Sequence, residues 1–102
     1  MRIPSRVFVT GASGFIGRAL VGRFAELGSK VAGADLHADP ARNVVAGDVS
    51  ESGDWQRHAK GSDLVIHTAA VVSNNAPAAL YRRVSVGSVR HVIDAAIAAG
   101  AW

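Results

Sequence analysis

The 102-residue chain has no cysteine, which excludes disulfide bonds and thiolate metal sites and fits a reducing compartment. It also lacks an apolar run of the roughly 18 residues needed to cross a bilayer, and its start leads directly into a strand instead of a signal-peptide core. Aromatic residues make up only 6% of the sequence, so few side chains are available to stack on bases. We therefore predict a cytoplasmic protein that binds neither membrane nor nucleic acid.

The formal net charge of +3 does not change this prediction. The basic residues are scattered, and the only tight group is Arg82 and Arg83 with Arg90 beyond them, which fits a solvated helix face. The histidines are His37, His58, His67 and His91. No two of them have ligand spacing with acidic support, so no metal site is expected.

Short apolar runs alternate with helix-spaced segments, a pattern typical of βαβ units and a parallel sheet. With 49% hydrophobic residues, the chain fits one small domain that buries roughly 60 to 70% of its unfolded surface. The expected strands are Arg6 to Thr10, Lys30 to Asp35, about Asn43 to Ala46, and Leu64 to Thr68. Right-handed crossovers predict a Rossmann-like, doubly wound parallel sheet of about four strands in the order 3-2-1-4.

Three helices are expected between and after these strands. The first runs from about Gly14 to Leu27. A short polar helix follows from about Glu51 to Lys60, with Ser50 as its N-cap, and a long helix runs from about Ala78 to Ala99. The apolar residues predicted to face the core are Ile16, Leu20, Phe24 and Leu27 in the first helix, and Val86, Val89, Ile93 and Ile97 in the last, with Val92 and Ala96 beside them.

The first strand breaks into three glycines spaced three apart, Gly11, Gly14 and Gly17. A helix that starts there presents unpaired backbone N–H groups and the positive end of its dipole, which suit a pyrophosphate. Gly11 is expected to make the tight turn, Gly14 to leave room for the phosphates, and Gly17 to let the helix pack on the strand. Ser13 is expected to cap the helix or to contact phosphate.

Asp35 closes the second strand, where a carboxylate can accept hydrogen bonds from the adenosine ribose hydroxyls and repel a 2′-phosphate. The predicted cofactor is therefore NAD, in preference to NADP. The alternative is a solvent-exposed aspartate at the start of a loop. Arg42 has two interpretations, a surface arginine or a guanidinium that meets a phosphate.

Together, the strand pattern, the glycine run and Asp35 resemble the amino-terminal part of an extended short-chain dehydrogenase/reductase, the NAD-dependent epimerase/dehydratase family. Thr10 through Gly17 match its Thr-Gly-x-x-Gly-x-x-Gly motif, and Phe15 and Ile16 match the Phe-Ile pair that usually precedes the last glycine. The resemblance covers essentially the whole chain, residues 1–102. It implies an NAD(P)-binding Rossmann domain, amino-terminal portion, in which these residues bind the dinucleotide.

Further family markers follow the third and fourth strands. Gly47-Asp48-Val49 matches a Gly-Asp-Val motif, which implies that Asp48 and Val49 hold the adenine; otherwise, Asp48 is a loop residue that caps the next helix. His67-Thr68-Ala69-Ala70 is similar to the His-x-Ala-Ala stretch, which implies that Ala69 and Ala70 lie against the cofactor's central ribose and pyrophosphate. The alternatives are close-packed alanines and a hydrogen-bonded interior histidine.

The catalytic apparatus of the family is not found in this sequence. Ser85 stands where the family usually has an asparagine that holds a water in the proton relay; otherwise, it is ordinary helix surface. Tyr81 is the only tyrosine, and the residue four positions later is Ser85 instead of the lysine that the family's Tyr-x-x-x-Lys motif requires. We therefore assign no catalytic residue.

The resemblance implies the cofactor-binding part of an oxidoreductase, epimerase or dehydratase acting on a hydroxyl or keto group of a small metabolite, a nucleotide sugar or a sterol-like alcohol. His67 to Ser73 is slightly more similar to the 3β-hydroxysteroid dehydrogenase side. The alternatives are a non-catalytic dinucleotide sensor, similar to the NmrA-like regulators, and an inactive fragment. Because the fourth strand would form an apolar sheet edge, the chain is also expected to associate with a second copy there.

Overall fold

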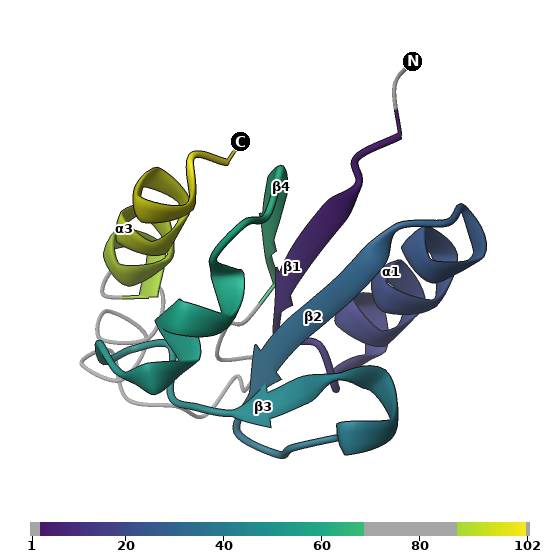
Figure 1. The fold of residues 1–102 in the computed structure, drawn as a ribbon. Helices are drawn as coiled ribbons and strands as arrows, with labels where there is room; N and C mark the ends of the chain where they lie inside the picture. Colours follow the sequence, from purple (N-terminus) through teal and green to yellow (C-terminus); the bar gives the residue numbers. More distant parts are fainter. Residues whose placement is uncertain (1–2, 69–87, 102) are drawn as a thin grey trace.

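The computed structural model describes residues 3–68 and 88–101. It contains one parallel sheet in the order β3-β2-β1-β4 (Figure 1). The strands are β1 (Arg6–Thr10), β2 (Lys30–Asp35), β3 (Val44–Ala46) and β4 (Leu64–His67). The predicted strand order is confirmed, as are the bounds of β1 and β2. β3 starts one residue later than predicted because Asn43 has left-handed backbone, with φ of 59°.

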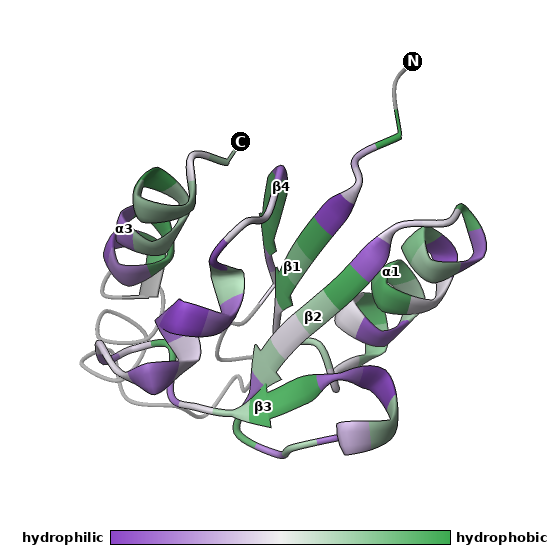
Figure 2. Cartoon of the chain, viewed as in Figure 1, coloured by the Kyte–Doolittle hydropathy of each residue, from purple (hydrophilic) through white to green (hydrophobic). Residues whose placement is uncertain are grey.

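Helices lie on both faces of this sheet (Figure 1). Helix α1 (Phe15–Glu26) packs on one face over a cluster that includes Val7, Val9 and Val21. The 3₁₀ helix η2 (Asp54–Ala59) and helix α3 (Ser88–Ala99) pack on the other face over a cluster built around Phe8 and Trp55. Figure 2 shows the apolar colour concentrated along the strands. The side chains of β1 alternate between the two cores, because Phe8 belongs to one cluster and Val7 and Val9 belong to the other.

The predicted inner face of α1 is wrong in part. Ile16 is 63% exposed and Leu27 is also exposed, whereas Gly17 and Val21 are buried and Phe24 is partly buried. The reason is that Gly17, which has no side chain, lets α1 come close to the turn at Gly11 and Ala12 that follows β1. The spacing of the large apolar residues gives no weight to a glycine and so places Ile16 on the inner face.

The predicted inner face of α3 is also wrong in part, because, of the residues expected there that the structure describes, only Val92 and Ala96, expected beside that face, are buried or partly buried. Val92 and Ala95 are buried against Phe8 and Trp55, while Val89 and Ile93 are exposed and Ile97 is 73% exposed. A small side chain at Ala95 allows α3 to come close to the elements beneath it, so the contact face does not follow the largest apolar residues. The part of the predicted helix before Ser88, including Val86, lies outside the described residues.

The helix that connects β3 and β4 is shorter than the predicted polar helix from about Glu51 to Lys60. The 3₁₀ helix begins at Asp54 after Gly53, so Ser50 is not its N-cap. Instead, Ser50 donates from both its backbone N–H and its hydroxyl to Oδ1 of Asp48, at 2.9 and 2.6 Å. Local side-chain to backbone bonding of this kind competes with helix formation and holds a turn here.

Candidate functional site

The three glycines form a strand-to-helix corner at the carboxyl end of β1. Gly11 has φ of 67°, a left-handed conformation in which glycine carries no steric cost. A Cβ on Gly17 would overlap the carbonyl oxygen of Gly11 and lie 2.9 Å from Cα of Ala12. A Cβ on Gly14 would lie 3.3 Å from the same oxygen. The expected turn at Gly11 and close packing at Gly17 are therefore confirmed.

Gly33 and Thr68, to which the motifs assigned no role, support this corner. A Cβ on Gly33 in β2 would lie 2.5 Å from Cβ of Ala12 and 2.8 Å from the carbonyl oxygen of Val9. Thr68, which follows β4, donates its hydroxyl to the carbonyl oxygen of Thr10 at 2.6 Å. The available sequence signal was a glycine inside an apolar strand, which often marks a close backbone approach.

Helix α1 presents backbone donors at this corner. Gly14 is the N-cap and accepts the N–H of Arg18 at 2.9 Å, so the N–H groups of Phe15, Ile16 and Gly17 have no acceptor inside the helix. The side chains of Phe15 and Ile16 are 95% and 63% exposed. These residues can therefore offer their backbone to an anion, and the helix dipole favours negative charge there.

Ser13 does not cap α1, because no side chain makes a cap hydrogen bond. Its hydroxyl donates to the carbonyl oxygen of His37 at 2.9 Å, and its backbone N–H donates to Oδ2 of Asp35 at 3.1 Å. The cap prediction for Ser13 is therefore wrong. Ser13 connects the glycine corner to the segment that follows β2.

Asp35 lies half-buried at the carboxyl end of β2, next to the glycine corner. Its Oδ1 accepts the N–H of His37 at 3.3 Å while its Oδ2 accepts that of Ser13. Each carboxylate oxygen has more than one lone-pair direction, so further donors such as sugar hydroxyls can be accepted. Arg42 lies instead beside Asp39, with Nη1 3.6 Å from Oδ2, in accordance with its interpretation as a surface arginine.

The Gly47-Asp48-Val49 segment follows β3 and is tied to β2. The N–H of Gly47 donates to the carbonyl oxygen of Asp35 at 2.8 Å, which places the two aspartate-bearing segments side by side. Asp48 accepts from Ser50 and lies six residues before η2 begins at Asp54, so it does not cap that helix. Val49 is buried with Trp55. The carboxyl ends of β1, β2 and β3 thus carry Gly11, Asp35 and Asp48 at one edge of the sheet.

His67 ends β4 and pairs with Thr10, the last residue of β1. The Thr10 hydroxyl lies 2.6 Å from Nδ1 of His67 and accepts the N–H of Thr68 at 3.1 Å. Desolvation by burial lowers the pKa of His67 below its ordinary value, so the neutral ring is favoured. His67 is therefore a hydrogen-bonded, part-buried histidine, in accordance with its interpretation as a hydrogen-bonded interior residue.

Some expected site residues cannot be placed. Ala69 and Ala70, and also Tyr81 and Ser85, lie outside the described residues. Within residues 3–68 and 88–101, no three His, Cys, Asp or Glu side chains are grouped so that they could hold a metal ion. No helix in the same ranges has the length and apolar character of a membrane span.

Comparisons with known proteins agree with this geometry. The model of the NAD dependent epimerase/dehydratase family matches residues 7–102, and the chain belongs to that family. A 3-beta-hydroxysteroid dehydrogenase from Mycolicibacterium neoaurum is 39% identical over 72 residues, which cover 66% of this chain and 20% of the relative. A 3 beta-hydroxysteroid dehydrogenase/Delta 5-->4-isomerase from Mycobacterium tuberculosis is 32% identical and covers 93% of this chain and 29% of its own length.

Solved structures show the same fold. A short-chain dehydrogenase/reductase superfamily protein from Agrobacterium tumefaciens, with bound NAD, has a TM-score of 0.81 and 32% identity, covering 94% of this chain and 30% of its own. A UDP-galactose 4-epimerase has a TM-score of 0.80 and 25% identity, covering 94% of this chain and 35% of its own. The cofactor of the family is NAD, and this chain has a Rossmann-like fold. The chain spans less than a third of the curated relatives that it matches.

Proposed function

We propose that residues 1–102 are the amino-terminal portion of an NAD-binding Rossmann domain and bind NAD at the carboxyl ends of β1, β2 and β3. The observation that carries this proposal is the corner at Gly11, Gly14 and Gly17, where the chain turns directly into α1 and the first backbone N–H groups of the helix have no acceptor inside it. Asp35 ends the neighbouring strand β2, and Asp48 follows β3 on the same side of that corner. The described residues therefore fit an extended dinucleotide with an anionic centre.

Each site residue has a proposed role. The N–H groups of Phe15, Ile16 and Gly17 donate to the pyrophosphate, with Gly11, Ser13 and Gly14 shaping the loop around it. Asp35 accepts the ribose hydroxyls and disfavours a 2′-phosphate. Asp48 and Val49 hold the adenine, while Ala69 and Ala70 lie against the central ribose and pyrophosphate. The bound nicotinamide supplies hydride transfer, for which this chain contributes cofactor binding only.

The substrate of the whole protein is proposed to carry a hydroxyl or keto group. The two relatives described above are named for 3-beta-hydroxysteroids, which favours a sterol-like alcohol. A nucleotide sugar is the second candidate, because a structural neighbour is a UDP-galactose epimerase. Assaying a longer protein that includes this chain with both substrate classes and NAD distinguishes them. A protein that turns over neither substrate would contradict this assignment.

The cofactor assignment is tested by titrating the 102-residue chain with NAD and with NADP in a calorimeter. We expect saturable NAD binding and weaker NADP binding, because the Asp35 carboxylate repels the added phosphate. Equal affinities, or tighter NADP binding, would overturn the role of Asp35. Absence of binding to either dinucleotide would overturn the proposed function as a whole.

We also propose that the chain forms a homodimer through β4. Among the described residues, β4 pairs with β1 and with no other strand, so its outer edge has backbone donors and acceptors that a second copy can pair with. Light scattering across a range of protein concentrations tests this. A monomer at every concentration would contradict it.

A further inference from the structure

Trp55 packs directly against the backbone of the segment proposed to hold the adenine. A Cβ on Gly47 would lie 2.7 Å from Cβ of Trp55 and 3.0 Å from Cγ and Cδ1 of its ring. Gly47 does not have a positive φ, so its requirement for glycine comes from this contact and not from backbone conformation. The side chain of Trp55 thus occupies the volume that any other residue at position 47 would need.

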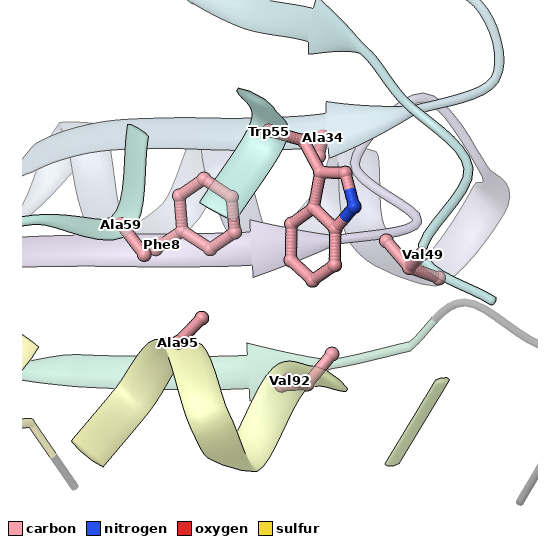
Figure 3. Packing of buried hydrophobic residues seen from close by; sticks show 7 residues of the cluster. All are labelled: Phe8, Ala34, Val49, Trp55, Ala59, Val92 and Ala95. Carbon is pink, nitrogen blue, oxygen red and sulfur yellow. The ribbon is translucent and has the colours of Figure 1, made fainter. Parts of the chain in front are cut away.

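The same tryptophan is fixed on two further sides. Its ring stacks on Phe8 of β1, with centroids 6.4 Å apart and planes 16° apart. Its indole Nε1–H donates to the carbonyl oxygen of Glu51 at 2.9 Å. In the view of Figure 3, the indole lies between the Phe8 ring and Val49. Trp55 therefore bridges the sheet core to both ends of the 47–51 turn.

That turn determines where the Asp48 carboxylate lies. Gly47 is anchored to β2 through the carbonyl oxygen of Asp35, and the N–H of Glu51 donates to the carbonyl oxygen of Asp48 at 3.0 Å. Both ends of the turn meet Trp55, through its packing on Gly47 and its hydrogen bond to Glu51. If the indole were lost, the turn would keep its tie to β2 but would lose the surface it rests on.

We propose that Trp55 is a positioning residue for adenine recognition, acting through Gly47 and Glu51 to hold the Asp48 carboxylate where the adenine amino group donates to it. This inference rests on the proposed function, because it assumes that the dinucleotide binds along this edge of the sheet. Trp55 itself makes no contact with the cofactor. Its role is to fix the base specificity of a site that other residues form.

The test compares NAD with nicotinamide hypoxanthine dinucleotide, which has a carbonyl oxygen in place of the adenine amino group. In the unchanged chain, we expect NAD to bind about tenfold or more tightly, because a hydrogen bond to a carboxylate is replaced by an oxygen facing an oxygen. The ratio of the two dissociation constants measures base recognition. A general loss of stability weakens both ligands and leaves this ratio unchanged.

Three variants and one control are measured by calorimetry, after a thermal melt has shown that each one folds. Trp55→Leu and Gly47→Ala should lower the ratio to about threefold or less, since one removes the support and the other displaces it. Trp55→Phe keeps a ring but loses the bond to Glu51, and should give an intermediate ratio. Val21→Ala removes buried volume on the opposite face of the sheet and should keep the full ratio.

The outcomes separate this inference from the proposed function. Folded Trp55→Leu and Gly47→Ala chains that keep the full preference for NAD would overturn the role of Trp55 and leave the NAD site intact. If those two variants do not fold, an unchanged ratio in Trp55→Phe would overturn it. An unchanged chain that binds both dinucleotides equally would overturn the adenine role of Asp48 together with this inference, and no NAD binding would overturn the proposed function itself.

Discussion

The backbone N–H of Ser13 donates to the side-chain oxygen Oδ2 of Asp35 at 3.1 Å, so the carboxylate at the end of β2 holds the glycine corner that follows β1. The hydroxyl of Ser13 reinforces this link through the carbonyl oxygen of His37. Asp35 therefore organises the pyrophosphate loop in addition to its proposed role at the ribose. Charge at Asp35 and order at the glycine corner are coupled.

This coupling predicts the effect of Asp35→Asn. The amide keeps one acceptor oxygen but loses the negative charge, so NAD affinity should fall about tenfold. NADP affinity should fall less, because the repulsion of its 2′-phosphate is removed. Calorimetric titration with both cofactors measures the ratio. Asp54→Asn, at an exposed carboxylate in η2, is the matched control and should change neither affinity; an unchanged ratio in Asp35→Asn would contradict the prediction.

Much of the fold follows from the sequence because strands covered on both faces produce continuous apolar runs, as in β2 and β4. Gly11 and Gly17 were predictable for a similar reason: a strand that turns sharply into a helix needs backbone without side chains at fixed positions. The glycine corner and its place in the fold are therefore encoded locally. Chain order and crossover handedness then fix the strand order.

The two helix faces and the supporting residues were not predictable in this way. Gly17 and Ala95 allow close contacts because they have no side chain or a small one. A hydropathy pattern does not show where a small residue lets two elements come close. Two contacts form only when the chain has folded. One is the packing of Trp55 on Gly47, and the other is the hydrogen bond from Ser13 to Asp35. Such pairs depend on tertiary geometry, which no local pattern contains.

Two glycines in α1 provide a matched pair for stability. Gly17→Ala should destabilise the chain by about 1 to 3 kcal/mol, because its Cβ would meet the fixed backbone of Gly11 and Ala12. Gly22→Ala should stabilise it by roughly 0.5 to 1 kcal/mol, since nothing lies within 4 Å of the added atom and alanine favours helix. Urea unfolding monitored by circular dichroism measures both changes. A stable Gly17→Ala chain would show that α1 does not pack as described.

Thr68 offers a test of how β4 supports the glycine corner. Thr68→Val removes the hydroxyl that bonds to the carbonyl oxygen of Thr10, and should cost about 1 kcal/mol of stability. NAD binding should weaken as well, because the same hydroxyl lies 3.4 Å from the carbonyl oxygen of Gly11. Thr68→Ser keeps the hydroxyl and should retain more of both properties. Melting and calorimetry measure stability and NAD affinity in both variants. If Thr68→Ser loses as much of each as Thr68→Val, the loss comes from packing and not from the hydroxyl.

The pair formed by Thr10 and His67 predicts how stability depends on pH. Burial lowers the pKa of His67 in the folded chain below about 6.5, the ordinary value that the unfolded chain retains. The unfolded state therefore binds more protons below that pH, and the free energy of unfolding decreases as pH falls through about 6.5. The decrease stops below the folded-state pKa. Protonation also removes the acceptor that faces the Thr10 hydroxyl.

Urea unfolding from about pH 8 to about pH 5 measures this dependence. His67→Asn keeps a polar acceptor but does not titrate, so its loss of stability on acidification should be smaller than that of the unchanged chain. His58→Asn, at an exposed position in η2, is the control and should follow the unchanged chain. A His67→Asn chain with the full acid sensitivity would show that other titrating groups cause it. The contact between Thr10 of β1 and His67 of β4 would then not account for the pH dependence.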